Sequence, residues 1–243
     1  MTIKALIWDV DGTVAETERD GHRVAFNAAF EALGLPWRWD VAHYGHLLRV
    51  TGGRERLLHD MAARADAPSD AAERNTLARE LHRRKNAIYR ETLGARGIPA
   101  RPGVLRLMDE CSAAGVMLGI ATTTSRGNVV ALFEGLLGVG WGRRFDALVC
   151  AEDAPLKKPH PQVYGLALQR LGIAAHEAFA LEDSPNGLRA ARQAGIACGV
   201  TRSVYFADGD FDGAAWVREH LDEAPAMTLD TLQARRAGTI AVS

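Results

Sequence analysis

The chain has 243 residues, a formal net charge of −1 and an ordinary composition, with 47% hydrophobic and 24% charged residues. A chain of this length folds as one large domain or as a domain that carries a smaller one. The composition excludes disordered and fibrous proteins. The near-neutral charge argues against nucleic-acid binding, because contacts to a phosphate backbone usually require a basic excess.

The cysteines Cys111, Cys150 and Cys198 are far apart and odd in number, which fits neither a metal site nor a disulfide framework. They predict buried thiols in a reducing compartment. No run approaches the roughly 20 apolar residues of a membrane span, and Lys4 and Asp9 occupy the region where a signal peptide is apolar. We therefore expect a cytoplasmic monomer that binds neither nucleic acid nor membrane.

Residues 3–14 read Ile-Lys-Ala-Leu-Ile-Trp-Asp-Val-Asp-Gly-Thr-Val. The apolar run fits a strand that is covered on both faces, as in a parallel sheet, whereas Asp and Gly are poor strand residues. We therefore expect the strand to end near Asp9. In open α/β sheets ligands bind outside the carboxyl ends of the strands, so Asp9 and Asp11 are predicted to lie at an active-site edge.

Residues 17–93 are predicted to be helical almost throughout. Apolar residues three and four apart predict a first helix, which Gly34 and Pro36 end. Further helices are expected over 41–50 and 54–64, and a long charged helix runs to about 93 from an N-cap at Ser69 or Asp70. This pattern predicts a small helical bundle inserted after the first strand.

Helices and strands alternate from residue 101 onward. The predicted strands cover residues 116–121, 147–150, 178–181 and 196–200. The predicted helices between them cover 103–115, 127–137 and 161–171, and another ends at 194. A short amphipathic helix is expected after 222. This order is typical of an α/β protein with a doubly wound, Rossmann-like parallel sheet. We predict an α/β core domain of residues 1–15 and 95–243 and an inserted α-helical cap domain of residues 16–94.

Polar groups follow successive strands of the predicted sheet. They are Asp9 and Asp11, the Thr-Thr-Thr-Ser run at 122–125, Lys158 in a loop, and Glu182 with Asp183. Parallel strands bring these ends to one edge, where several acids repel one another unless a cation balances them. Ligands that are all oxygen atoms favour a hard ion, and Mg²⁺ is the leading candidate.

Each motif alone has a simpler interpretation. Asp-x-Asp-Gly also forms turns and parts of calcium loops, a threonine run also caps a helix, Lys-Lys-Pro also forms a solvated turn, and Glu-Asp-Ser-Pro also starts a helix. Their joint order at successive strand ends favours a catalytic site instead.

This joint pattern, over about residues 3–200, resembles the haloacid dehalogenase superfamily of phosphatases and phosphomutases. Residues 9–14 look like its first motif, Thr122 its second, Lys158-Pro159 its third and residues 182–187 its fourth, and the helical insertion is similar to its C1 cap. Residues 16–18, 53–55 and 181–184 are most similar to the β-phosphoglucomutase and CbbY-type branch. Dehalogenases of the family lack the second Asp, so Asp11 disfavours dehalogenation.

The residues themselves suggest a mechanism for phosphate-ester hydrolysis. Asp9 would attack phosphorus and form an aspartyl phosphate, while Asp11 would protonate the leaving alkoxide and later take a proton from water. Lys158 and Thr122 would bind the phosphoryl oxygens, and Thr13 would support the tight turn at Gly12. Lys157 and Thr123 remain alternatives to Lys158 and Thr122, and Thr123 is also a candidate substrate contact.

The predicted metal site takes its ligands from the same strand ends. Mg²⁺ would be held by the carboxylates of Asp9 and Asp183 and by the main-chain carbonyl of Asp11, and it would bring nucleophile and phosphate together despite their like charges. Glu182 would act through a metal-bound water.

The cap is expected to contact the part of the substrate that does not react. The resemblance makes Gly53 and Arg54 part of a specificity loop, and Arg54 and Arg49 are candidates to bind a second phosphate. Glu18 and His22 lie four residues apart on one helix face and are candidates for binding sugar hydroxyls, although His22 could equally be a packed histidine.

The predicted function is therefore that of a Mg²⁺-dependent phosphatase acting on a small sugar phosphate. The resemblance alone implies xylulose 1,5-bisphosphate, an inhibitory by-product of ribulose bisphosphate chemistry, as the substrate. A β-phosphoglucomutase is the alternative enzyme, since it returns the phosphoryl group to a sugar rather than to water. A sugar-phosphate-binding regulatory module is the alternative without turnover.

Overall fold

The computed structural model of the chain describes residues 2–236 and contains a six-stranded sheet in the order β3-β2-β1-β4-β5-β6. All neighbouring strands are parallel. The strands are β1 (Ala5–Trp8), β2 (Met117–Ala121), β3 (Ala147–Val149), β4 (Ala178–Glu182), β5 (Ala197–Thr201) and β6 (Trp216–Arg218). The central strand β1 pairs with β2 and β4, so Trp8 lies between Ile120 and Leu181. The residue after it, Asp9, therefore emerges at the middle of the sheet edge.

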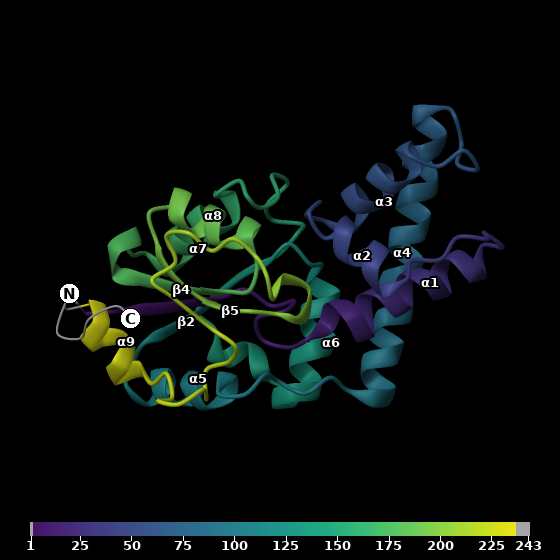
Figure 1. The fold of residues 1–243 in the computed structure, drawn as a ribbon. Helices are drawn as coiled ribbons and strands as arrows, with labels where there is room; N and C mark the ends of the chain where they lie inside the picture. The colour runs from purple at the N-terminus through teal and green to yellow at the C-terminus, as the bar shows by residue number, and fades with distance from the viewer. Residues whose placement is uncertain (1, 237–243) are drawn as a thin grey trace.

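Helices cover both faces of the sheet (Figure 1). Alternate residues of β1 point to opposite faces, so Leu6 and Trp8 join one hydrophobic cluster and Ala5 and Ile7 join another. The first cluster is completed by α5 (Val104–Ala113), α6 (Arg126–Leu137) and α9 (Leu229–Arg236), and the second by α7 (Gln162–Leu171) and α8 (Pro185–Gln193). The predicted doubly wound α/β sheet is confirmed.

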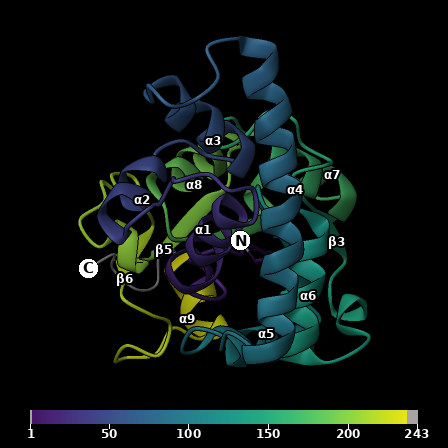
Figure 2. The same ribbon diagram turned by 90° about the vertical axis from the view of Figure 1, so that its right-hand side faces the viewer.

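A separate group of helices lies beside the carboxyl edge of the sheet, with the long α4 running past α6 (Figures 1 and 2). Its members are the π-helical turn η1 (Glu18–His22), α1 (Arg23–Ala32), α2 (Val41–Leu47), α3 (Gly53–Ala62) and α4 (Ala71–Arg96). They enclose their own aromatic cluster, in which the rings of Phe30 and Trp39 lie 5.0 Å apart. We base the proposed division into a cap of 16–94 and a core of 1–15 and 95–243 on this cluster; residues 1 and 237–243 lie outside the described residues.

Two short connections join the cap to the core and are tied to each other. Ala15 forms a β-bridge with Ala100, and the main-chain N–H of Arg101 donates to the carbonyl of Val14. The guanidinium of Arg101 also donates to the carbonyls of Gly12 and Thr201. The loop that follows β1, which carries both predicted catalytic acids, is thereby fixed to the end of β5.

Three features differ from the sequence-based expectations. The helix before Gly34 starts with the π-helical turn η1, and α4 continues to Arg96, past the predicted cap boundary. Strand β6 has three residues, too few to give a recognisable pattern, and was not predicted. The expected tail helix is present as α9. Among the described residues, we find no helix with the length and apolar character needed to cross a membrane.

Candidate active site

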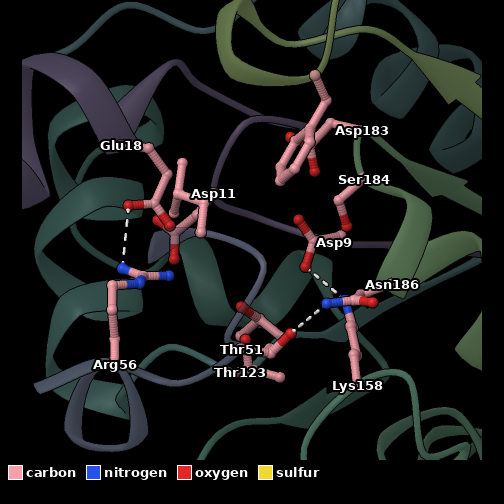
Figure 3. Close-up of a pocket in the computed structure, with 13 residues that line it drawn as sticks. Asp9, Asp11, Glu18, Thr51, Arg56, Thr123, Lys158, Asp183, Ser184 and Asn186 are labelled. Atoms are coloured by element: carbon pink, nitrogen blue, oxygen red, sulfur yellow. Dashed lines mark hydrogen bonds and ion pairs between the residues drawn. The ribbon is translucent and has the colours of Figure 1, made fainter. Parts of the chain in front are cut away.

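The carboxyl ends of the central strands and the facing cap enclose a cleft, whose empty space of about 500 Å³ includes the part open to solvent. Figure 3 shows side chains from the strand ends and from the helices beside them pointing into it. The lining residues are Asp9, Asp11, Glu18, Leu48, Thr51, Arg56, Thr122, Thr123, Lys158, Asp183, Ser184, Asn186 and Phe206. The cleft therefore brings together the polar groups that follow β1, β2 and β4 and those of the loop after β3. This is the arrangement expected for a parallel sheet, whose strands all end at the same edge.

Lys158 and Asp9 form a buried ion pair at the floor of the cleft (Figure 3). The Lys158 Nζ lies 2.6 Å from Asp9 Oδ1 and 2.5 Å from Glu182 Oε1, and the Tyr164 hydroxyl donates to the same Glu182 oxygen at 2.6 Å. Burial raises the pKa of Asp9 to about 7; Lys158 lowers it, while Glu182 and Asp11 raise it further. Burial alone would lower the pKa of Lys158, but the two carboxylates raise it above its ordinary value. Lys158 therefore remains a fixed positive charge.

Asp9, Glu182 and Asp183 form a buried cluster whose carboxylate oxygens lie within 4.8 Å of one another. Burial and the charges of Asp9 and Glu182 raise the pKa of Asp183 well above its ordinary value. The Ser203 hydroxyl, at 2.5 Å, donates to Asp183 and fixes its orientation. A divalent cation would stabilise the ionised form of these buried acids. Their ligand atoms are all oxygen, which fits Mg²⁺.

Gly12 allows the loop after β1 to pass close to this acid cluster. Its φ is +88°, and a Cβ at this position would lie 2.1 Å from Asp183 Oδ2. Thr13, the next residue, places its hydroxyl 3.1 Å from Asp9 Oδ2 and 3.5 Å from Asp183 Oδ1. Glycine is therefore required both for the turn and for the approach of Asp183, and Thr13 links Asp9 to Asp183.

The structure separates the two neighbouring lysines. Lys158 points into the cleft, whereas the Lys157 Nζ donates to the carbonyls of Ala151 and Ala154. Thr122 and Thr123 both line the cleft. The Thr122 hydroxyl accepts a hydrogen bond from the main-chain N–H of Thr124 at 3.2 Å, so its proton is free to point to a phosphoryl oxygen.

The side chain of Asp11 turns away from Lys158 and toward the cap. Its Oδ1 accepts from the Thr17 hydroxyl at 2.5 Å and lies 3.0 Å from His22 Nε2, and Lys85 Nζ lies 2.9 Å from His22 Nδ1. An ammonium can only donate, so His22 accepts at Nδ1 and donates to Asp11 from Nε2. Burial raises the pKa of Asp11, but these hydrogen bonds and the positive charge of the His22–Lys85 pair bring it below its ordinary value.

Lys85 was not predicted as part of the site. It lies on α4 among exposed bases, and nothing in that pattern distinguishes it, yet its side chain is buried. Burial lowers its pKa to about 8, although Glu18 and Asp11 act in the opposite direction. The structure also brings Glu18 and His22 toward Asp11, on the side of the cleft that the cap covers.

The cap contributes a second polar group that was only partly predicted, made of Glu18, Tyr44 and Arg56. The Tyr44 hydroxyl donates to Glu18 Oε2 at 2.5 Å and accepts from Arg56 Nη1 at 2.8 Å. Arg56 is only 6% exposed, and within residues 2–236 its Nε has no hydrogen-bond partner. A buried donor without a partner is costly, so this guanidinium is suited to a ligand that enters the cleft.

The two arginines named from the sequence lie elsewhere. Arg49 and Arg54 are exposed, and neither is among the described residues that line the cleft. Arg49 instead borders a surface groove beside Val204. Gly53 lines a recess next to the cleft, where a Cβ would lie 3.0 Å from the ring of His82.

This recess, with about 360 Å³ of empty space, shares Asp11, Glu18, Arg56 and Thr123 with the main cleft. The Ser125 hydroxyl and the Asn128 Oδ1 in its wall are buried and, like Arg56 Nε, have no hydrogen-bond partner among the described atoms. The recess is therefore a polar extension of the cleft, leading away from Asp9 along the cap.

Residues 3–195 match the haloacid dehalogenase-like hydrolase family, and the chain belongs to this family. It is an enzyme, a phosphatase of that family.

Within the family the chain is similar to proteins called CbbY. It is 46% identical over 225 residues to the plasmid-encoded CbbY of Cupriavidus necator, which covers 91% of this chain and 87% of that protein. The crystal structure of CbbY from Rhodobacter sphaeroides with phosphate is 38% identical, has a TM-score of 0.86, and covers 93% of this chain and 98% of that one. A variant of the same protein, 37% identical here with the same TM-score and coverage, was crystallised with xylulose 1,5-bisphosphate.

Proposed function

We propose that the protein is a Mg²⁺-dependent phosphatase that removes one phosphate from xylulose 1,5-bisphosphate. The observation that carries the proposal is the arrangement of the cleft, which has the Asp9–Lys158 pair at one end and the buried Arg56, with a free donor, in its cap wall. A bisphosphate has one anionic group for each end. The similarity to a CbbY that binds this sugar supports the choice of substrate.

Asp9 is the proposed nucleophile. One carboxylate oxygen attacks phosphorus in line with the ester oxygen, so that the P–O bond to the sugar breaks as the aspartyl phosphate forms. Lys158 and the Thr122 hydroxyl are placed to stabilise the charge on the phosphoryl oxygens. Mg²⁺, held by Asp9, Asp183 and the Asp11 carbonyl, would supply further neutralisation of that charge.

Asp11 is the proposed acid and base. When the sugar leaves as an alkoxide it needs a proton, and Asp11, two residues from the nucleophile, supplies it. The resulting carboxylate, held by Thr17 and His22, then takes a proton from the water that hydrolyses the aspartyl phosphate. The enzyme returns to its starting state with one sugar product and one inorganic phosphate released.

The non-reacting end of the sugar is proposed to enter the polar recess. Glu18, whose carboxylate is held by the Tyr44 hydroxyl, offers a hydrogen-bond acceptor to hydroxyl groups, and Arg56 offers a charged donor to the second phosphate. We propose that Arg56 takes the role that the sequence suggested for Arg54 and Arg49.

Replacing Arg56 should therefore affect bisphosphates selectively. We expect Arg56→Gln to lower kcat/KM for xylulose 1,5-bisphosphate by about 10- to 100-fold, the value of a charge-assisted hydrogen bond. Turnover of p-nitrophenyl phosphate, which has no second phosphate, should fall by no more than about threefold on the same grounds. Arg54→Gln, two residues away and exposed, is the matched control and should leave both substrates unaffected. Equal losses on both substrates would remove Arg56 from second-phosphate recognition.

The proposed function is tested by a phosphate-release screen over sugar mono- and bisphosphates, with Mg²⁺ and with EDTA. We expect Mg²⁺-dependent release with the highest kcat/KM for xylulose 1,5-bisphosphate. Transfer of the phosphoryl group to added hexose phosphate without release of inorganic phosphate would indicate a mutase. Tight binding of the sugar without turnover would indicate a binding module, and either result would overturn the proposal.

A further inference from the structure

Asn186 joins the core to the cap directly above the cleft. Its side-chain Nδ2 donates to the Thr51 hydroxyl at 2.9 Å and to the Arg49 carbonyl at 3.1 Å, and Figure 3 shows the first of these contacts at the edge of the cleft. Thr51 and Arg49 belong to the connection between α2 and α3 of the cap, whereas Asn186 belongs to α8 of the core. Neither the proposed chemistry nor substrate binding uses this contact.

The core side of the contact is rigid. Asn186 lies in the first turn of α8, three residues after Asp183, and the Ser184 hydroxyl caps this helix by accepting from the main-chain N–H of Gly187 at 3.0 Å. The Oδ1 of Asn186 accepts from Arg189, which orients its amide toward the cap. The amide donors therefore keep a fixed position relative to the acid cluster.

The cap side of the contact lies beside the cleft that holds the nucleophile, which Thr51 also lines. Asp9 and Lys158 are only 6% and 4% exposed, so separation of the cap from the core would give a sugar phosphate a wider route to the nucleophile. The neighbouring contact is apolar: the ring of Tyr205 in the core lies 5.7 Å from the ring of Tyr44 in the cap. Apolar contacts are not directional, whereas the two hydrogen bonds of Asn186 exist only when the cap is in place.

We propose that Asn186 is a positioning residue that holds the cap closed over the substrate, with Thr51 and Arg49 as its partners. It contacts no reacting atom. When the contact forms, Glu18 and Arg56 face Asp9 across the cleft; when it breaks, the cleft opens for exchange of substrate and product. This inference rests on the proposed function only for the identity of the sugar.

The kinetic test is a double-mutant cycle between the two sides of the contact. Asn186→Ala should lower kcat/KM for xylulose 1,5-bisphosphate by about threefold to tenfold, as expected for lost hydrogen bonds of ordinary strength. Thr51→Val should have a smaller effect, and the double variant should be no worse than Asn186→Ala alone. Turnover of p-nitrophenyl phosphate, which does not reach the cap residues, should change by less than about twofold.

The control is Arg192→Ala, which removes a hydrogen bond from the same helix to the Asp212 carbonyl, within the core. It should leave both activities unchanged. Additive losses in the cycle, or equal losses on both substrates, would overturn the proposed role of Asn186.

Hydrogen exchange tests the same contact without any substrate. Main-chain amides of α2 and of the connection to α3 should exchange faster in Asn186→Ala than in the wild type, while those of the sheet should not change. Unchanged exchange in the cap would overturn the inference. If the wild type failed to hydrolyse xylulose 1,5-bisphosphate, the proposed substrate would be wrong, but the exchange result would still decide the role of Asn186.

Discussion

Asp9→Asn is expected to abolish phosphate release, with a loss of about 10⁴-fold or more in kcat. The amide of asparagine is nearly the same size as the carboxylate but carries no charge and is a poor nucleophile. The Asp9–Lys158 ion pair is lost with the charge. Steady-state phosphate release measures the effect, and mass spectrometry of the quenched enzyme should detect a phosphoryl group on the wild type alone.

The loss should not come from unfolding. Burial and neighbouring charges already raise the pKa of Asp9 to about 7, so a neutral side chain relieves repulsion in the acid cluster, and the Tm of the metal-free variant should not fall. Asp109→Asn is the matched control, because Asp109 is exposed on α5 and pairs with Arg144 far from the cleft; it should retain full activity. Undiminished phosphate release by Asp9→Asn would refute nucleophilic catalysis by Asp9.

The core of the fold was predictable because each element carries a local signal. The apolar run before Asp9 ends where the backbone leaves the sheet, and Asp70 caps α4 by accepting from the main-chain N–H groups of Ala72 and Glu73. Parallel strands place all their carboxyl ends at one edge of the sheet. The topology alone therefore predicts that Asp9 and Asp183, 174 positions apart in the sequence, lie close together. Strand β6 escaped prediction because its three residues are too few to give a recognisable pattern.

The cap contacts were harder to predict because they depend on where one helix begins. The sequence predicted a helix over 54–64, and the resemblance made Gly53 and Arg54 part of a specificity loop. The structure instead starts α3 at Gly53 after a turn at Gly52, whose φ is +98°. Residues two apart on a helix point in nearly opposite directions, so Arg54 faces solvent and Arg56 faces the cleft.

Tyr44 and Lys85 are site residues that the sequence pattern could not reveal. Each lies on a helix whose pattern is explained by packing or by solvation, and each becomes a site residue only through a partner on another element. Tyr44 joins Glu18 to Arg56, and Lys85 reaches Asp11 through His22, 63 positions earlier in the chain. Such pairs leave no local signal.

Asp11→Asn is expected to lower kcat for sugar phosphates by about 10²- to 10⁴-fold, the range for loss of a general acid and base. The amide can still accept from Thr17 and from His22 Nε2, so the geometry of the site should be retained. The two half-reactions, however, lose a proton donor and a proton acceptor, respectively. Asp20→Asn, which affects an exposed ion pair with Arg19 in the cap, should have no effect.

The two roles of Asp11 can be separated with a substrate whose leaving group needs no proton. p-Nitrophenolate leaves as a stable anion, so transfer of the phosphoryl group to Asp9 should remain fast in Asp11→Asn, whereas hydrolysis of the aspartyl phosphate still lacks its base. We expect a burst of p-nitrophenolate equal to the enzyme concentration, followed by slow turnover and accumulation of phosphorylated enzyme. Slow release without a burst would show that Asp11 acts before the phosphoryl group reaches Asp9. Thr17, His22 and Lys85 favour the carboxylate form of Asp11, which is the form that acts as base in the second half-reaction, the step that this variant isolates.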